Sequence, residues 1–580
     1  MRINLFENKQ NTAVLFLFSL CVINLLLMHY DIVFTCQTEA PFDYTSITDN
    51  LFSSTFDVCT ILFFCSFICR KKIICILLMT YSLTLIWAFS NILYARFFHS
   101  YLSLSAISQS NALIDPIVIR SAIVGLRWQD LFLGVSPVLF YLIKKRITRP
   151  PVFKTILIPF FLLILFLIID VSAHISYCIN NPAYRYITYF EYRFDSHHFA
   201  DHNALCEPIL SSFHRGSIRT LGKEFLDNYK APLKLSEIQL TKIRQISEET
   251  KNSMNYLGHP AIKKNVVLVI IESYMSFTSM LEVDGKEVTP FLNSLRRDSL
   301  VYYNGRMNPN ITIGESSDGQ FLYMTGLLPL RSIITISKAK NRVLPGLPKV
   351  MKQKGMKSRM IIPTKPTMWE QVSMCKQYGF DLLLSSEDYQ NGIFSELSDE
   401  QVFDFASEVE NKSKDCFFTV ILTMSMHQPY LEPVDQSYLI NKHSIPEDLK
   451  NYLNACHYTD KQIEKYMEGH KKRGTYDNTM FIITSDHHVH STGFGDGVNN
   501  LLPLYIINGD INSNEAWYGD CNQIDVYTTI LNLLDIKTKW YGLGHSLLTK
   551  NYSNSVNSLK FDISEWILFS DYFKNIKYAI

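Results

Sequence analysis

Two apolar segments of the chain each end in residues that can bind a metal ion. Residues 266–271 run into Glu272, and residues 480–485 run into Asp486 and His487. Short apolar runs rich in Val and Ile are typical of strands buried on both faces of a parallel sheet. In open α/β sheets, chemistry lies just beyond the carboxyl ends of such strands. A single carboxylate there is also typical of a helix cap or a surface residue, but two such segments together predict a shared site.

A third candidate is Ser316, which lies in the sequence Gly-Glu-Ser-Ser-Asp just before an apolar helical pattern. A serine at a helix N-terminus lies beside free N–H groups and the positive end of the helix dipole, which favour anions. Serine is also common at this position simply because it is a good N-cap. Because Gly314 allows close approach and a metal site is expected nearby, Ser316 is a candidate nucleophile.

These residues fall in a segment where strand patterns alternate with helical ones. This alternation predicts an α/β domain with a mostly parallel, doubly wound sheet. The predicted strands are 266–271, 358–362, 417–424, 480–485 and 504–507. The predicted helices are 290–297, 319–325, 347–354, 459–469 and 525–534, preceded by a solvated helix within 235–256.

The first third of the 580-residue chain is dominated by long apolar runs, whereas the remainder has ordinary globular composition. A helix needs about 20 mostly apolar residues to span a bilayer. Five spans are predicted, at residues 12–30, 56–69, 73–94, 131–143 and 155–173. The second and fourth are short and also fit buried core helices. A cleaved signal peptide is not expected, because the first run is long and further spans follow it.

Basic residues in short loops predict the orientation of the spans. They precede the first span and occur between spans two and three and between spans four and five, whereas residues 31–57 contain none. This pattern predicts a multi-pass protein of the cell (inner) membrane with a cytoplasmic N-terminus and an extracytoplasmic C-terminal part. The predicted domains are a transmembrane domain of five helices (1–175), an extracytoplasmic linker with helices (176–262) and a catalytic domain (263–580). The net charge of +1 gives no support for nucleic-acid binding.

Two polar features outside these domains' cores each have two interpretations. Arg96, among aromatic residues after the third span, either holds a lipid phosphate or snorkels to the membrane interface. His197, His198 and His202 in the linker form either a metal site or a solvated loop. We favour the loop, because no strand or helix pattern frames these histidines.

The order of the motifs resembles the lipoteichoic-acid synthase family, whose members have five membrane spans and an extracellular domain of the alkaline-phosphatase/sulfatase superfamily. The matching pieces are residues 91–98 with 108–109, 271–273, 284–293, 314–318, 423–430, 485–487, 523–525 and 542–548. The resemblance covers most of the chain and is weakest in the polar linker.

The resemblance implies a metal site with a serine nucleophile. The implied metal ligands are Glu272, Ser316, Asp486 and His487. Ser316 takes the nucleophile position, which is usually threonine in the family. His427 falls at a catalytic histidine near the substrate phosphate, and Trp369 falls at a tryptophan that contacts the headgroup. Manganese is the expected metal, and zinc or magnesium also suits such ligands.

The implied function is a transfer reaction at the membrane. A phosphoglycerol-type headgroup would pass from a membrane phospholipid, through a covalent phospho-Ser316, to a hydroxyl of a glycan, glycolipid or polymer. Two positions depart from the family pattern: Gln371 replaces an arginine that binds phosphate, and Thr364 replaces an acid. These departures leave open a phosphoethanolamine transferase of the same superfamily.

Two further alternatives are disfavoured. A sulfatase needs Cys or Ser in the pattern C/S-x-P-x-R, and the chain contains no such piece. A non-catalytic membrane scaffold or sensor would keep its cellular function after Ser316→Ala or Glu272→Ala. All four implied ligand positions nevertheless carry residues that can bind a metal.

Overall fold

The computed structural model of the chain describes residues 2–36, 44–69, 73–98, 100–108, 125–145, 147, 154–180, 208–229, 232–254, 265–394, 396–430, 433–438, 440, 444–489, 494 and 498–575. Contacts divide the chain into two units, Met1–Tyr229 and Lys230–Ile580. The domain limits predicted from the sequence stay a prediction. His197, His198 and His202 lie outside the described residues.

The second unit is built on a sheet. Its described residues form eight strands in the order β10-β4-β9-β8-β1-β7-β5-β6. Their bounds are β1 (Asn265–Ile271), β4 (Tyr302–Asn308), β5 (Lys357–Ile361), β6 (Leu382–Leu384), β7 (Phe417–Leu422), β8 (Thr479–Ser485), β9 (Leu502–Ile507) and β10 (Cys521–Asn522). Among them β9 is the strand that runs antiparallel to its neighbours. The predicted mostly parallel sheet is confirmed.

The five strands predicted from sequence are β1, β5, β7, β8 and β9. Four of them, β1, β7, β8 and β9, were detectable because each is a mainly apolar run whose residues are almost all buried. The fifth, β5, has the sequence KSRMI and is buried at four of its five residues. β4 escaped prediction because its sequence, YYNGRMN, contains Asn, Gly and Arg. A separate small hairpin pairs β2 (Glu282–Val283) with β3 (Lys286–Glu287).

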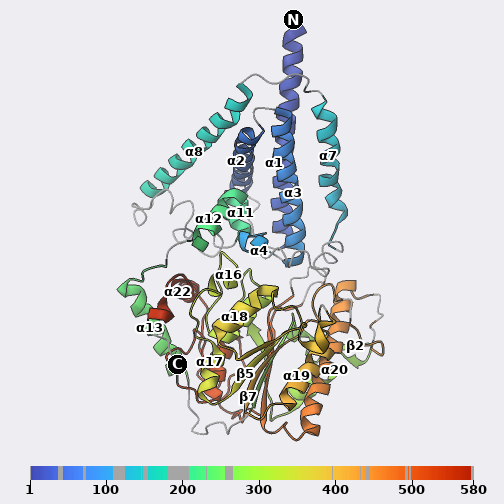
Figure 1. The fold of residues 1–580 in the computed structure, drawn as a ribbon, viewed down its shortest axis with the longest axis vertical. Helices are drawn as coiled ribbons and strands as arrows, with labels where there is room; N and C mark the ends of the chain where they lie inside the picture. Colours follow the sequence, from blue (N-terminus) through green and yellow to red (C-terminus); the bar gives the residue numbers. More distant parts are fainter. Residues whose placement is uncertain are drawn as a thin grey trace. The chain divides into compact units, whose positions relative to one another are not determined.

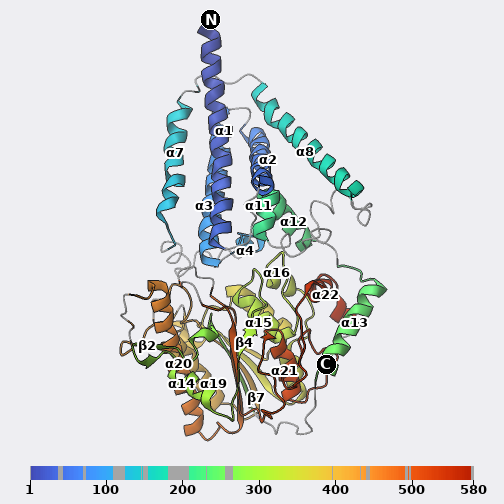
Figure 2. The same cartoon turned by 180° about the vertical axis from the view of Figure 1, so that it is seen from behind.

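Helices cover both faces of the sheet (Figures 1 and 2). One face carries α14 (Pro290–Arg297), α19 (Asp399–Asn411) and α20 (Glu447–Lys472). The other carries α15 (Ser316–Thr325), α16 (Thr335–Ala339), α17 (Leu347–Gln353), α18 (Gln371–Tyr378), α21 (Asp525–Leu533) and α22 (Ser558–Phe569). The unit also contains α13 (Glu237–Asn252) and α23 (Tyr572–Asn575).

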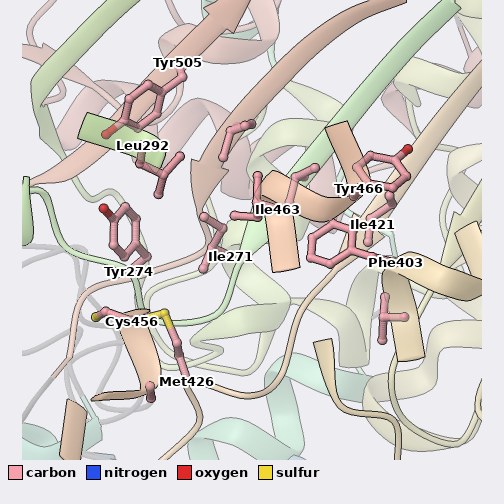
Figure 3. Close-up of a cluster of buried hydrophobic side chains, with 14 of the residues drawn as sticks. Ile271, Tyr274, Leu292, Phe403, Ile421, Met426, Cys456, Ile463, Tyr466 and Tyr505 are labelled. Carbon is pink, nitrogen blue, oxygen red and sulfur yellow. The ribbon is translucent and has the colours of Figure 1, made fainter. Parts of the chain in front are cut away.

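The face under α14, α19 and α20 holds a large apolar core (Figure 3). Ile271 and Ile421 project from β1 and β7 toward Phe403 of α19 and Ile463 of α20, and all four are at most 3% exposed. Fully burying one such side chain contributes roughly 1.5–3 kcal/mol. This core fixes the strands whose ends carry the polar residues described below.

The first unit is a bundle of mostly apolar helices. They are α1 (Arg2–Thr35), α2 (Tyr44–Ile68), α3 (Ile73–Phe98), α4 (Leu104–Ser108), α7 (Leu131–Lys144), α8 (Lys154–Asn180), α11 (Pro208–Arg215) and α12 (Ser217–Tyr229). The helix α1 packs against α2, α3 and α7, and α2 also packs against α8 and α11.

Four helices of the described chain are long and apolar enough to cross a membrane. The segments are Thr12–Thr35, Ile47–Ile68, Ile73–Arg96 and Leu163–Asn180. The fourth predicted span corresponds to α7, which has 14 residues. At 1.5 Å per residue it is about 21 Å long, shorter than a hydrocarbon layer of roughly 30 Å. The apolar N-terminal helices are therefore confirmed as four, with α7 as a shorter fifth.

Arg96 is the centre of a buried ion cluster that joins three elements of this bundle. Its guanidinium donates to both carboxylate oxygens of Asp31, both of Asp130 and the carbonyl of Gly125, at 2.7–3.2 Å. These contacts use all five N–H donors of the arginine, so none remains for a lipid phosphate. The side chain is 3% exposed. Both interpretations of Arg96 from the sequence were wrong, because neither anticipated these two carboxylates.

We expect Arg96→Gln to lower the stability of the first unit. The change leaves the Asp31 and Asp130 carboxylates without their cation, and such an uncompensated buried charge costs about 3–5 kcal/mol. Thermal unfolding of the purified protein in detergent measures the loss. Lys145→Gln, at an exposed position just after α7, is the matched control and should unfold like wild type. Equal unfolding of both variants would contradict the prediction.

Candidate metal centre and nucleophile

The register between β1 and β8 places Glu272 and Asp486 side by side. The two strands run parallel, and their last paired residues are Ile271 and Ser485. Each carboxylate belongs to the residue that directly follows its strand, so both lie at the carboxyl-terminal end of the parallel strands. The amide N–H of Ser273 donates to Asp486 Oδ1 at 2.8 Å. That bond holds the Asp486 carboxylate against the end of β1.

His487 completes this group. Its backbone N–H donates to Asp486 Oδ1 at 2.7 Å, and its Nδ1 lies 2.8 Å from the carbonyl oxygen of His488. A carbonyl oxygen only accepts, so Nδ1 carries a proton and donates it. The other ring nitrogen, Nε2, lies 3.3 Å from Glu272 Oε1 and 3.6 Å from Asp486 Oδ2.

Ser316 reaches the same place from another strand. After β4 the chain forms a short loop and enters α15 at Ser316. Ser316 Oγ lies 3.2 Å from Glu272 Oε2 and 3.1 Å from His487 Nε2. The structure thus brings together all four residues that the sequence predicted as metal ligands.

The loop before Ser316 is organised by the buried carboxylate of Asp318. It accepts hydrogen bonds from the backbone N–H groups of Thr312 and Gly314 and from the hydroxyls of Thr312 and Thr335, at 2.8–3.0 Å. A Cβ on Gly314 would lie 2.3 Å from Asp318 Oδ1, so only glycine fits there. Burial raises the pKa of Asp318 to about 6 although these four donors act to lower it.

The residue directly before Ser316 has a strained backbone. Glu315 has φ 46° and ψ −122°, a conformation that non-glycine residues rarely adopt. Such a conformation costs about 1–3 kcal/mol and persists only where the surroundings hold it. Here the Glu315 carbonyl accepts from the amides of Asp318 and Gly319 in the first turn of α15.

The helix α15 lies directly on the end of β8. A Cβ on Gly319 would lie 2.2 Å from the carbonyl oxygen of Asp486, so the absence of a side chain is what permits this approach. The same carbonyl accepts a hydrogen bond from Gln523 Nε2 at 2.6 Å. One turn further on, the Tyr323 hydroxyl donates to the carbonyl of Ser485 at 2.6 Å.

The buried charges of the group perturb one another strongly. Burial acts to raise the pKa of Glu272, but its hydrogen bond to His487 and the charge of that ring outweigh burial and hold the pKa well below its usual range. Burial, reinforced by the Glu272 charge, raises the pKa of Asp486 to about 7. Burial acts to lower the pKa of His487, but the Asp486 and Glu272 carboxylates outweigh it and hold the pKa well above its usual range.

These residues fit a divalent cation. Ligand atoms of Glu272, Asp486 and His487 all lie within 4.8 Å of one another, and all three residues are buried. Carboxylate oxygens suit magnesium and manganese, and the imidazole adds an affinity for zinc. With the Ser316 hydroxyl, the group offers four ligands in total. The identity of the metal stays a prediction.

His427 and Trp369 follow two other strands, β7 and β5, which run parallel to β1 and end on the same side of the sheet. His427 comes after β7 in a loop whose start is held by Asp399, which accepts from the amides of Met424 and Ser425 at 2.9 Å. The charge of the His427 ring acts, after that of His487, to lower the pKa of Glu272, so the ring lies within electrostatic reach of the group. Trp369 follows β5, is half-buried and has φ 49°. Their roles stay predictions.

Comparison with known proteins places this architecture in a class. Residues 264–536 match the sequence model of the sulfatase family. The match spans β1 to β10 and includes Glu272, Ser316, Asp486 and His487. This part of the chain is therefore a sulfatase-family domain of the alkaline-phosphatase superfamily.

Within that class the chain is a homologue of lipoteichoic acid synthases. It is 27% identical to the lipoteichoic acid synthase of Staphylococcus aureus over 359 residues, which cover 58% of this chain and 55% of that protein. The chain thus aligns with about half the length of the curated relatives it matches. The resemblance predicted from the motifs is confirmed.

Two solved structures have a similar fold. The integral membrane phosphoethanolamine transferase EptA of Neisseria meningitidis matches with a TM-score of 0.50 and 14% identity, over 93% of this chain and 98% of that one. The lipoteichoic acid synthase LtaP of Listeria monocytogenes matches with a TM-score of 0.46 and 18% identity, over 57% and 98%. At these identities the likeness concerns the fold alone.

We expect Gly319→Ala to disrupt the group by pushing α15 away from β8. The added methyl would meet a backbone carbonyl that is fixed by strand pairing, and such overpacking costs about 1–3 kcal/mol. Urea unfolding of the purified protein measures this loss, and metal titration of the same variant should show weaker binding. Gly134→Ala, in a helix with no atom within 4 Å of the new Cβ, is the matched control. Wild-type stability and metal affinity in Gly319→Ala would refute the assigned role.

Proposed function

We propose that the protein is a membrane-bound, metal-dependent transferase for substituted phosphate groups. It moves a phosphoglycerol-type headgroup from a membrane phospholipid to a hydroxyl of a glycan, glycolipid or polymer, through a covalent phospho-Ser316. One observation carries the proposal: Ser316 Oγ lies 3.2 Å from Glu272 Oε2 and 3.1 Å from His487 Nε2, at the N-terminus of α15. Homology to lipoteichoic acid synthases supports the same reaction class.

In the first step Ser316 Oγ attacks the phosphorus of the donor. The Oγ–P bond forms, the P–O bond to diacylglycerol breaks, and the serine proton, which the Glu272 carboxylate accepts as a hydrogen bond before the attack, is released to solvent. His427 donates a proton to the departing diacylglycerol alkoxide. When bound, a divalent cation lowers the pKa of the serine hydroxyl and stabilises negative charge on the phosphoryl oxygens.

In the second step the acceptor hydroxyl attacks the same phosphorus. The new O–P bond forms, the P–Oγ bond breaks, and Ser316 Oγ takes up a proton from solvent. His427 now removes the proton of the acceptor, which reverses its first role. Ser316 begins α15, and the positive end of the helix dipole there favours the anionic phosphoryl group in both steps.

The membrane helices would hold the active site near its phospholipid donor. A phospholipid headgroup can reach Ser316 when the active site and the lipid share one membrane surface. We infer a cytoplasmic N-terminus, five crossings with α7 as the fourth, and an extracytoplasmic sulfatase-family domain. Positively charged loops on the inner side support this orientation.

A phosphoethanolamine transferase is the second candidate. It is supported by Gln371, which stands where an arginine for phosphate is expected. Gln371 is 5% exposed and begins α18, just after Trp369. The fold likeness to EptA also extends over the helices of the first unit.

Intact mass distinguishes these candidates. The purified protein is loaded with Mn²⁺ and incubated with phosphatidylglycerol or phosphatidylethanolamine, and the mass added to the chain identifies the headgroup. We expect a glycerol-phosphate adduct that is absent from Ser316→Ala and present in the control Ser294→Ala, which changes an exposed serine of α14. An ethanolamine-phosphate adduct would select the second candidate, and no adduct with either lipid would refute both.

The predicted orientation is tested with single added cysteines. Lys414→Cys, exposed in the sulfatase-family domain, should react with a membrane-impermeant maleimide in intact spheroplasts above the wild-type background. Lys145→Cys, exposed just after α7, should react only after lysis. The opposite result for Lys414→Cys would show that one of the five helices does not cross, and α7 is the shortest of them.

A further inference from the structure

Glu315 lies against the side of the His487 ring that faces away from the metal centre. Its Oε2 is 3.6 Å from His487 Nδ1, and the two side chains are 11% and 10% exposed. The same Nδ1 donates to the carbonyl of His488. The Nδ1 proton is thus donated to the His488 carbonyl, and the Glu315 carboxylate lies beside it as a charge, while Nε2 faces Ser316 and Glu272.

Glu315 is not placed to be a metal ligand itself. The ligand atoms that lie within 4.8 Å of one another come from Glu272, Asp486 and His487. Glu315 approaches this group only through the opposite nitrogen of the imidazole. Its effect on a bound cation must therefore pass through the ring or act as a charge at longer range.

The position of Glu315 is demanding for a residue with a side chain. Its φ of 46° would suit glycine, which needs no such strain. The first turn of α15 holds the residue there, through hydrogen bonds from Asp318 and Gly319 to its carbonyl. A strained residue at a candidate site is a reason to look for a function of its side chain. Here the carboxylate is directed at one atom of a predicted metal ligand.

We propose that Glu315 is a positioning residue for His487 that tightens divalent-metal binding. Its negative charge beside the Nδ1 proton stabilises the tautomer and ring orientation that the His488 carbonyl sets, and it increases the electron density that Nε2 offers to the cation. Carboxylates behind metal-bound histidines act in this way and change metal affinity 10–100-fold. The proposal rests on the proposed metal dependence of the transferase.

The test compares metal affinity with stability in full-length protein in detergent. Metal-free wild type, Glu315→Gln, Glu315→Gly and the exposed control Glu282→Gln are titrated with Mn²⁺ in competition with a fluorescent chelator. We expect the Mn²⁺ dissociation constant to rise about 10–100-fold in both Glu315 variants and to stay within twofold in the control. Glu315→Gly relieves the backbone strain, so its metal-free unfolding temperature should equal or exceed that of wild type.

The outcomes distinguish an effect of the Glu315 carboxylate from an effect of its backbone conformation. A wild-type affinity in Glu315→Gln overturns the inference and leaves the proposed function standing. Weak binding by Glu315→Gly alone also overturns it, because the backbone rather than the carboxylate would then be responsible. A wild-type protein that binds none of Mn²⁺, Mg²⁺ and Zn²⁺ would refute the metal dependence and this inference together.

Discussion

The pairing of β1 with β8 is the constraint on which the candidate site depends. Six parallel residue pairs before Ile271–Ser485 set the register, and the residue that follows each strand carries a carboxylate. A slip of one residue would turn one of the two carboxylates to the other face of the sheet. The apolar core on both faces prevents that slip, because it would move every buried Val and Ile of the strand into the core on the opposite face, where the packing does not match. Packing along the strands thus determines the distance between the two predicted metal ligands, Glu272 and Asp486.

The nucleophile is placed by a different kind of contact, a close approach between backbones. Gly319 rests on the carbonyl of Asp486, and Gln523 and Tyr323 bind the carbonyls of Asp486 and Ser485. These contacts therefore position the helix that carries Ser316 against the end of β8, which is followed by Asp486. The strained Glu315 backbone then turns the chain so that Ser316, which carries the hydroxyl, is the first residue of α15. Strain at this point is offset by the buried hydrogen bonds of Asp318.

Much of this architecture was predictable from sequence because buried parallel strands have a distinctive composition. The apolar runs before Glu272 and Asp486 identified β1 and β8, and the motif around Ser316 identified the start of α15. The sequence could not show that the two strands are neighbours, because β1 and β8 lie more than 200 residues apart and pairing is decided by tertiary packing. Sequence reasoning also missed β4, because its polar composition is not typical of a buried strand. The partners of Arg96 were equally invisible, since Asp31 and Asp130 are far from it in sequence.

The charge of the site bears on whether the cation or the substrate binds first. Among the described residues, the ion pairs of Glu272 and Asp486 are with His487 alone, so two buried carboxylates share one imidazole. Glu315 adds a third carboxylate beside the same ring. A phosphodiester brings a further negative charge and would be repelled strongly where burial lowers the dielectric constant. A divalent cation held by Glu272, Asp486 and His487 would neutralise two of these three negative charges and would present its own positive charge to the phosphoryl oxygens. In the proposed reaction, metal binding would therefore precede substrate binding.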